Sequence, residues 1–271
     1  MPKATIYVAM HEKDDHVLCI KDPIYKFIHC GKSIYREDLD TRYPNGYLPE
    51  FGDNTGDNIS ELNYDYCELT AMYWAWKNDK SSPEDIIGLV HYRRYFAESE
   101  DRNTELMSQK TMEDILINKG YHFIINCCDF DESNFEIDEN AESVYIGFEG
   151  MHDINDLDNA LIAIHKLYPD IADKMEFMIK HNYPMAYCNM IITKKKYFDE
   201  YASFLFSVLD YVYDHCNTRG NRGAGYVAER LLRPWLLVTG HSATQGHELN
   251  WSKYSGYKWI FTSEEEEDID E

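Results

Sequence analysis

The sequence is poor in basic residues. Its 26 lysine and arginine residues face 49 aspartate and glutamate residues, and the formal net charge is −23. A nucleic-acid partner requires a basic surface, so this charge argues against one. It also disfavours broad electrostatic attachment to anionic lipid, while a local contact with a membrane-borne substrate stays open.

Long apolar runs are absent as well. No stretch reaches the roughly 18 uninterrupted apolar residues of a transmembrane helix, and the N-terminus enters a short β-prone segment instead of a signal peptide. We therefore expect a cytoplasmic protein that can work at the inner face of a membrane.

Paired cysteines and internal repeats are also missing. The seven cysteines contain no C-x-x-C pair, and most lie within apolar segments. We expect them to be reduced residues in or near the core, without a zinc site or a disulfide framework. The 271 residues, 44% of them hydrophobic, are enough for one large domain. We place this domain at residues 1–262, followed by a solvated acidic tail, Ser263–Glu271.

The segments that are present alternate between strand and helix patterns. Strands are expected at Ala4–Met10, Tyr25–Cys30, Ile86–Val90, Tyr121–Asn126 and Tyr187–Thr193. Helices are expected at Ile59–Asn78, Thr111–Lys119, Asp153–Tyr168, Ile171–Lys180, Phe198–His215 and Gly225–Val238, the last bent or broken at Pro234. This order predicts an α/β, Rossmann-like single domain with a mostly parallel central sheet flanked by helices.

The segment Ile86–Phe96 (IIGLVHYRRYF) combines a buried strand with a cationic cluster. In open α/β sheets ligands bind outside the carboxyl ends of the strands, so His91, Arg93 and Arg94 are expected at a site. Guanidinium groups match phosphate and carboxylate oxygens, which makes the arginine pair a candidate anion clamp. The alternative is that both arginines form structural ion pairs with acidic neighbours.

Two polar residues interrupt apolar elements. Glu229 lies on an otherwise apolar helix, where a carboxylate facing a site can accept a proton from a hydroxyl nucleophile. The alternative is an ion pair with Arg230 or Arg233. Asn189 lies in an apolar strand, where it either orients a ligand or satisfies local backbone groups.

Weaker candidates lie earlier in the chain. Tyr7 is near the end of the first strand, which in nucleotide-binding sheets commonly meets the base or ribose. Asp57 and Asn58 precede the first helix, whose positive end can receive an anionic or hydroxyl-rich ligand. Asn58 with Glu61 also fits a capping box, so a purely structural cap is the alternative.

Asp129 and Asp131 are a candidate metal site, because their D-x-D spacing suits a divalent cation such as Mg²⁺ or Mn²⁺. The same spacing recurs at Asp38–Asp40, Asp156–Asp158 and Asp268–Asp270, as expected in so acidic a chain. An arginine pair can stabilise the charge on a leaving diphosphate without a metal. We therefore predict no cofactor and do not favour a cation.

Five longer motifs span most of the chain. They are TGDNIS (Thr55–Ser60), NYDYCELTAMYWAWKN (Asn63–Asn78), IIGLVHYRRYF (Ile86–Phe96), YCNMIITKKKYFDEY (Tyr187–Tyr201) and GYVAERLL (Gly225–Leu232). Together they resemble a family of bacterial glycosyltransferases of capsule, exopolysaccharide and O-antigen biosynthesis, long known only as a domain of unknown function. The resemblance implies a GT-A-like fold and a UDP-sugar donor, UDP-galactofuranose in a characterised member. It also implies a glycan acceptor carried on a lipid at the inner membrane face.

The residues and the resemblance combine into one expected mechanism. Arg93, Arg94 and His91 hold the diphosphate, Tyr7 and the Asp57–Asn58 loop contact nucleotide or sugar, and Glu229 deprotonates the acceptor hydroxyl, with inversion. One alternative is a glycan- or nucleotide-sugar-binding relative without turnover. Another is a nucleotidyltransferase or phosphate-ester hydrolase, which requires metal carboxylates at strand ends.

Overall fold

The computed structural model describes residues 2–11, 19–20, 22–35, 51–127, 143–181, 186–247 and 259–260. The aspartates Asp129 and Asp131 and the acidic segment Ser263–Glu271 lie outside the described residues.

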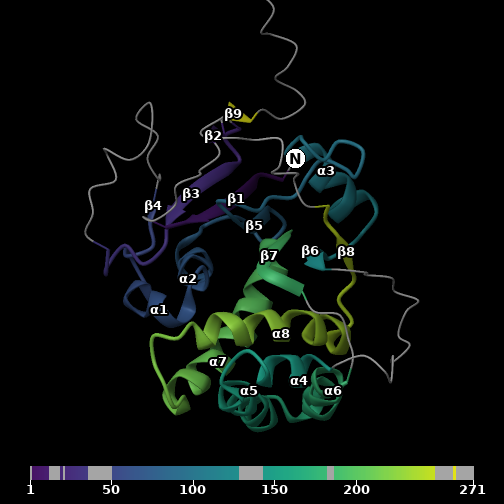
Figure 1. The fold of residues 1–271 in the computed structure, drawn as a ribbon. Helices are drawn as coiled ribbons and strands as arrows, with labels where there is room; N and C mark the ends of the chain where they lie inside the picture. The colour runs from purple at the N-terminus through teal and green to yellow at the C-terminus, as the bar shows by residue number, and fades with distance from the viewer. Residues whose placement is uncertain are drawn as a thin grey trace, which may run out of the picture.

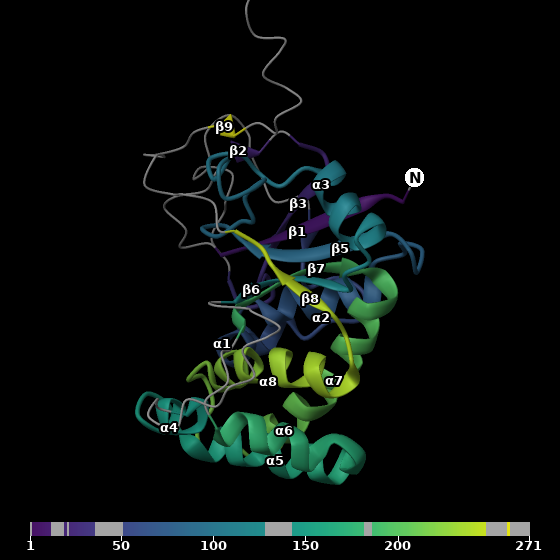
Figure 2. The ribbon, with the colours of Figure 1, turned by 90° about the vertical axis from the view of Figure 1, so that its right-hand side faces the viewer.

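A seven-stranded sheet forms the centre of the protein, in the order β4-β3-β1-β5-β7-β6-β8 (Figures 1 and 2). Its strands are β1 (Ala4–Met10), β3 (Tyr25–His29), β4 (Phe51–Gly52), β5 (Ile86–His91), β6 (Phe123–Cys127), β7 (Ala186–Lys194) and β8 (Ala243–Gln245). Of these seven, β7 alone runs antiparallel to its neighbours. The prediction of a mostly parallel sheet is therefore confirmed. A separate pair joins β2 (Cys19–Ile20) to β9 (Trp259–Ile260).

The central strand β5 is apolar up to its last residue because both faces of the sheet are covered there. The buried residues of β5 run from Ile86 to Val90 without a polar interruption. Gly88 is required there, since a Cβ at this position would lie 2.8 Å from the carbonyl oxygen of Ile191 on β7.

Helices cover the two faces unequally. One face is covered by α2 (Leu69–Asn78), α7 (Lys195–His215) and α8 (Gly223–Thr239), and the opposite face by α3 (Gln109–Glu113) and the π-helical η4 (Asp114–Asn118). A further layer of α4 (Val144–Glu149), α5 (Ile154–Leu167) and α6 (Pro169–Lys180) packs against α7 and α8 (Figure 2). No helix among the described residues combines the length and the apolar composition needed to cross a membrane.

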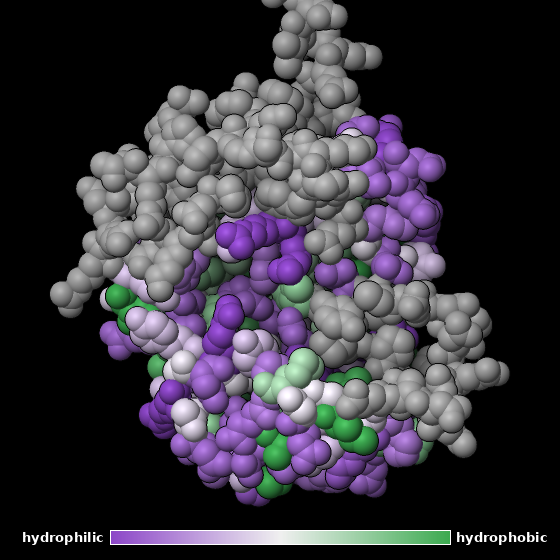
Figure 3. Space-filling view, in the orientation of Figure 1, coloured by the Kyte–Doolittle hydropathy of each residue, from purple (hydrophilic) through white to green (hydrophobic). Residues whose placement is uncertain are grey.

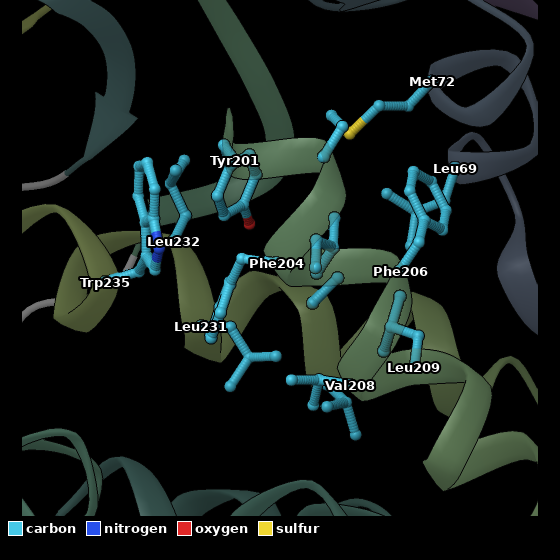
Figure 4. Packing of buried hydrophobic residues seen from close by; sticks show 14 of the residues in the cluster. Leu69, Met72, Tyr201, Phe204, Phe206, Val208, Leu209, Leu231, Leu232 and Trp235 are labelled. Carbon is cyan, nitrogen blue, oxygen red and sulfur yellow. The ribbon is translucent and has the colours of Figure 1, made fainter. Parts of the chain in front are cut away.

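The larger core lies between the sheet and these helices. Figure 4 shows its centre, where Tyr201 and Phe204 of α7 meet Leu231 and Trp235 of α8. The rings of Tyr201 and Trp235 lie 5.1 Å apart, centroid to centroid. Truncating a buried aromatic residue of this kind costs about 3–5 kcal/mol of folding free energy. This packing fixes α8, which later supplies one wall of the candidate site.

The helix predicted at Ile59–Asn78 is wrong as a single element. The segment forms η3 (Ser60–Leu62), α1 (Asn63–Tyr66) and α2, with a break at Cys67, whose φ is +50°. The Asn63 side chain donates to the Cys67 carbonyl at 2.7 Å and to the Thr70 hydroxyl at 3.1 Å. These local bonds replace helical backbone bonds and stabilise the break.

Of the two alternatives predicted at Pro234, a bend or a break, the break is wrong. The helix α8 is one element from Gly223 to Thr239, with Pro234 inside it. A proline in a helix interior costs about 3 kcal/mol because it removes a backbone hydrogen bond and clashes with the preceding turn. Packing of α8 on β7, α6 and α7 offsets this cost.

Candidate functional site

The parallel strands β1, β3 and β5 end side by side. Met10 pairs with His29, and Ala9 pairs with His91. A cavity of about 780 Å³ opens at these strand ends. In the view of Figure 3, a hollow bordered by hydrophilic side chains lies near the middle of the molecule. The lining residues come from the strand ends, α1 and the segment after it, β7 and α8: Ala9, Met10, His11, Cys30, Tyr35, Asn63, Tyr64, Cys67, Glu68, His91, Tyr92, Arg93, Arg94, Cys188, Gly220, Arg222, Gly225, Tyr226 and Glu229.

A tight turn presents the two arginines to this cavity. His91 and Arg94 exchange backbone hydrogen bonds of 3.0 and 3.1 Å, which reverses the chain directly after β5. Arg93 and Arg94 are both exposed on the cavity wall, and the Arg93 guanidinium lies 4.8 Å from the centre of the Tyr92 ring. The turn thus offers two guanidinium groups at the carboxyl edge of the sheet.

Glu229 lies on the same cavity, on α8. Its side chain is 20% exposed, and its Oε1 accepts a hydrogen bond of 2.8 Å from the backbone N–H of Cys188. Oε2 accepts a hydrogen bond of 2.8 Å from Arg230, so the ion pair with Arg230 that was the structural alternative is present. Glu229 nevertheless lines the cavity. Burial raises the pKa of Glu229 above its usual value, against the opposing effects of the Cys188 N–H and Arg230. A carboxylate with a raised pKa is a stronger base.

An unusual backbone segment in β7 joins the two sides of the cavity. Cys188 and Asn189 both have positive φ, +63° and +51°, and the Cys188 carbonyl contacts His91 Nε2 at 2.6 Å. The buried Asn189 amide donates to Glu68 Oε1 at 2.7 Å and to the carbonyl of Gly225 at 3.3 Å. Asn189 is not among the residues that line the cavity, and both of its partners are distant in the sequence rather than local backbone groups. Its role in ligand binding stays a prediction.

Three further predicted binding residues, besides Asn189, lie outside the cavity lining. Tyr7 is 4% exposed, donates to Asp79 Oδ2 at 2.6 Å and packs edge-on against Trp74, because it lies in the middle of β1 and not at its end. Asp57 bonds with Asn78 and Tyr73. Asn58 contacts the backbone of Gly56 and Ser60 at 3.0 and 3.2 Å. We leave these three out of the site.

Several lining residues were not singled out from the sequence. Glu68 was placed inside a continuous helix, and no local pattern signals the break that turns it toward the cavity. Arg222 and Tyr226 lie at the start of α8. A signal was available for them, because the glycine-rich segment Arg219–Gly225 precedes a helix, an arrangement that often binds anions.

The described residues offer no cluster of side chains for a metal ion. The described residues contain no group of three or more His, Cys, Asp or Glu side chains placed to hold a metal ion. The candidate pair Asp129 and Asp131 lies outside them. The charged groups that the cavity does present are Arg93, Arg94, Arg222, Glu68 and Glu229.

Comparison with known proteins gives a fold and a family. No curated protein matches the sequence. The chain is similar to a solved structure described as the apo form of the WbbM bifunctional glycosyltransferase, with a TM-score of 0.69 and 24% identity. The similarity covers 91% of this chain and 45% of the other, so this chain spans less than half the length of that protein. The expected GT-A-like fold is thereby confirmed. Residues 5–240 match the family described as a domain of unknown function (DUF4422), and the chain belongs to that family.

Proposed function

We propose that this protein is a glycosyltransferase that transfers a sugar from a UDP-sugar to a hydroxyl group of an acceptor. One observation carries the proposal: a single cavity of about 780 Å³ gathers the arginine pair after β5 and the half-buried carboxylate of Glu229 on α8. The fold supports it, because the similar structure is described as a glycosyltransferase.

In this proposal the donor lies against the carboxyl ends of β1, β3 and β5. Arg93 and Arg94, with His91 beside them, bind the diphosphate through charge-assisted hydrogen bonds. The base and ribose lie toward His11 and Tyr35, whose rings are 4.3 Å apart at this edge of the cavity. This assignment replaces the expected contact with Tyr7.

Glu229 is the proposed general base. It takes the proton from the acceptor hydroxyl, whose oxygen attacks the anomeric carbon of the sugar. The bond from that carbon to the β-phosphate oxygen breaks, and UDP leaves with the electron pair. The guanidinium groups stabilise the negative charge that grows on the leaving diphosphate, so no divalent cation is required. A single displacement of this kind inverts the anomeric configuration.

The finer identity of the substrates follows the family resemblance. We propose galactofuranose as a candidate donor sugar and a lipid-linked or oligosaccharide acceptor of bacterial surface-polysaccharide synthesis. Such an acceptor places the reaction in the cytoplasm, at the inner face of the membrane.

Incubation of the purified protein with a panel of UDP-sugars tests this function. We expect UDP to bind and UDP release to be measurable with at least one sugar, with activity retained in EDTA. UDP binding without release in the presence of glycan acceptors favours the binding relative without turnover. Absence of UDP binding overturns the proposal.

A further inference from the structure

A third arginine lines the cavity on the wall formed by α1 and the start of α8. Arg222 donates its backbone N–H to the carbonyl of Tyr64 at 3.1 Å, and its Nε donates to Cys67 Sγ at 3.3 Å. Its guanidinium lies 5.9 Å from the centre of the Tyr226 ring. None of these contacts involves the turn that carries Arg93 and Arg94.

The backbone of Arg222 is held in a strained conformation. Its φ is +67°, and the non-glycine residues with positive φ in the described part of the chain are Cys67, Cys188, Asn189 and Arg222. Three of them line the cavity, and Asn189 bonds to the lining residue Glu68. Strain of about 1–3 kcal/mol per residue persists only where surrounding contacts enforce it, and it concentrates at functional sites.

Tertiary contacts enforce the strain at Arg222. The buried carboxylate of Asp65 accepts the backbone N–H of Gly220 at 2.6 Å, which anchors the loop just before Arg222. The Tyr64 carbonyl anchors Arg222 itself. The fold therefore fixes the place of this guanidinium on the cavity wall.

The partners of Arg222 among the described residues are uncharged. They are the Cys67 thiol and Tyr226, and no carboxylate in this part of the chain forms an ion pair with the guanidinium. Burial raises the pKa of Cys67 to about 11, so the thiol is neutral near pH 7. The described lining of the cavity holds three arginines and two glutamates, a higher share of basic residues than in the chain as a whole, whose net charge is −23.

Two tyrosines of the cavity lining contact this arginine. Arg222 bonds to the backbone of Tyr64, which is 54% exposed, and its guanidinium lies over the Tyr226 ring. Aromatic faces provide apolar contact surface for sugar rings, and a guanidinium beside them provides paired donors for an oxyanion. This wall is also the one that carries Glu229, the proposed base.

We propose that Arg222 binds an oxyanion on the acceptor, so that the acceptor is an anionic sugar bearing a phosphate or a carboxylate. The inference rests on the proposed function, since it takes the Arg93–Arg94 side as the donor site. A phosphate and a carboxylate both present an oxyanion to Arg222, and matched probes distinguish between them.

The test measures binding of three matched probes by calorimetry with the donor site saturated by UDP. The probes are glucose, glucose 1-phosphate and glucuronate. We expect at least one charged probe to bind about tenfold or more tightly than glucose, and its binding to weaken with added salt. Preference for glucose 1-phosphate indicates a phosphate, and preference for glucuronate indicates a carboxylate. Equal binding of all three probes overturns the proposal.

Variants assign the effect to Arg222. Arg222→Gln should abolish the preference for the charged probe and leave UDP affinity near the wild-type value. Arg219→Gln is the matched control, because Arg219 lies on the same loop, packs over the Tyr213 ring at 4.3 Å and does not line the cavity. Arg222→Lys keeps the positive charge but lacks the paired N–H donors of a guanidinium, so it should retain part of the preference. It serves as the second variant if Arg222→Gln does not fold.

The outcomes separate this inference from the proposed function. If Arg222→Gln lowers the affinity for UDP as much as the affinity for the charged probe, Arg222 belongs to the donor site and the inference is overturned. If UDP fails to bind the wild-type protein, the proposed function fails. Arg222-dependent binding of the charged probe would in that case still support an oxyanion site.

Discussion

Cys188 donates its backbone N–H to Glu229 Oε1 at 2.8 Å, while its carbonyl contacts His91 Nε2 at 2.6 Å. One peptide segment of β7 thereby connects the proposed base on α8 to the turn that carries the arginine pair. The positive φ of Cys188, +63°, is what aims its N–H and its carbonyl at these two partners. A small change in this segment should therefore displace both the base and the diphosphate-binding turn.

Replacing Glu229 should abolish turnover without removing donor binding. Glu229→Gln retains an acceptor for the Cys188 N–H but cannot take a proton, and we expect kcat to fall by about 10²–10⁴-fold. UDP affinity, measured by calorimetry, should stay near the wild-type value. A Glu229→Gln enzyme with wild-type kcat would exclude Glu229 as the base.

The pH dependence of turnover should report the same carboxyl. Only the deprotonated form can accept a proton, so kcat should rise with pH through the pKa of Glu229. Burial raises this pKa, so the rise should lie above the ordinary glutamate value of about 4.3. The measurement is kcat against pH for UDP release. If kcat has already reached its plateau below the ordinary glutamate pKa, Glu229 is not the group that titrates.

The arginine pair should determine donor affinity. Arg93→Gln and Arg94→Gln each remove a guanidinium from the cavity wall, and we expect UDP to bind about tenfold or more weakly to each. Arg219→Gln, outside the cavity lining, is the control for the loss of one positive charge. Unchanged UDP affinity in both variants would favour the alternative of structural ion pairs with acidic neighbours.

Asn189 should act as a positioning residue. Asn189→Gly and Asn189→Ala both delete the amide that donates to Glu68, but only glycine accepts a φ of +51° without a steric penalty. We expect the alanine variant to be about 1–2 kcal/mol less stable than the glycine variant. Both should lower kcat and shift its pH profile, because Glu68 is one of the charges that act on Glu229. A glycine variant with an unchanged pH profile would show that the amide positions nothing.

Asp156 should make the protein less stable as pH rises. Its carboxyl is 1% exposed and Oδ1 has no hydrogen-bond partner, and burial, with Asp153 and Asp65 nearby, raises its pKa from 3.8 to about 6. The unfolded chain loses this proton near pH 3.8 and the folded chain near pH 6. The free energy of unfolding therefore falls as the pH rises from 3.8 to about 6, and it stays lower above that.

Asp156→Asn should therefore stabilise the protein above pH 6 by about 1–3 kcal/mol and have little effect below pH 4. Urea denaturation of both proteins at the two pH values measures the difference. Asp173→Asn is the control, because the Asp173 side chain is 97% exposed. Equal stabilisation at both pH values would contradict the assignment to ionisation of Asp156.

The sequence alone determined most of the longer strands and helices and four residues of the cavity lining, His91, Arg93, Arg94 and Glu229. The uninterrupted apolar run of β5 identified a strand buried on both faces, and the charged residues directly after it located Arg93 and Arg94 at the carboxyl edge of the sheet, where the cavity opens. The isolated Glu229 on an apolar helix was visible for the same reason. Each is a local pattern of polarity, set by which face of an element is covered.

Only the tertiary structure decided which residues complete the site. The break at Cys67 and the positive φ values of Cys188, Asn189 and Arg222 are unfavourable conformations in an isolated chain. Asn63 stabilises the break at Cys67 locally, but the conformations in β7 and at Arg222 depend on long-range bonds, such as that between Asn189 and Glu68, which are 121 residues apart in the sequence. These contacts place Glu68 and Arg222 on the cavity wall, and pairing between such distant residues is not encoded in a local pattern.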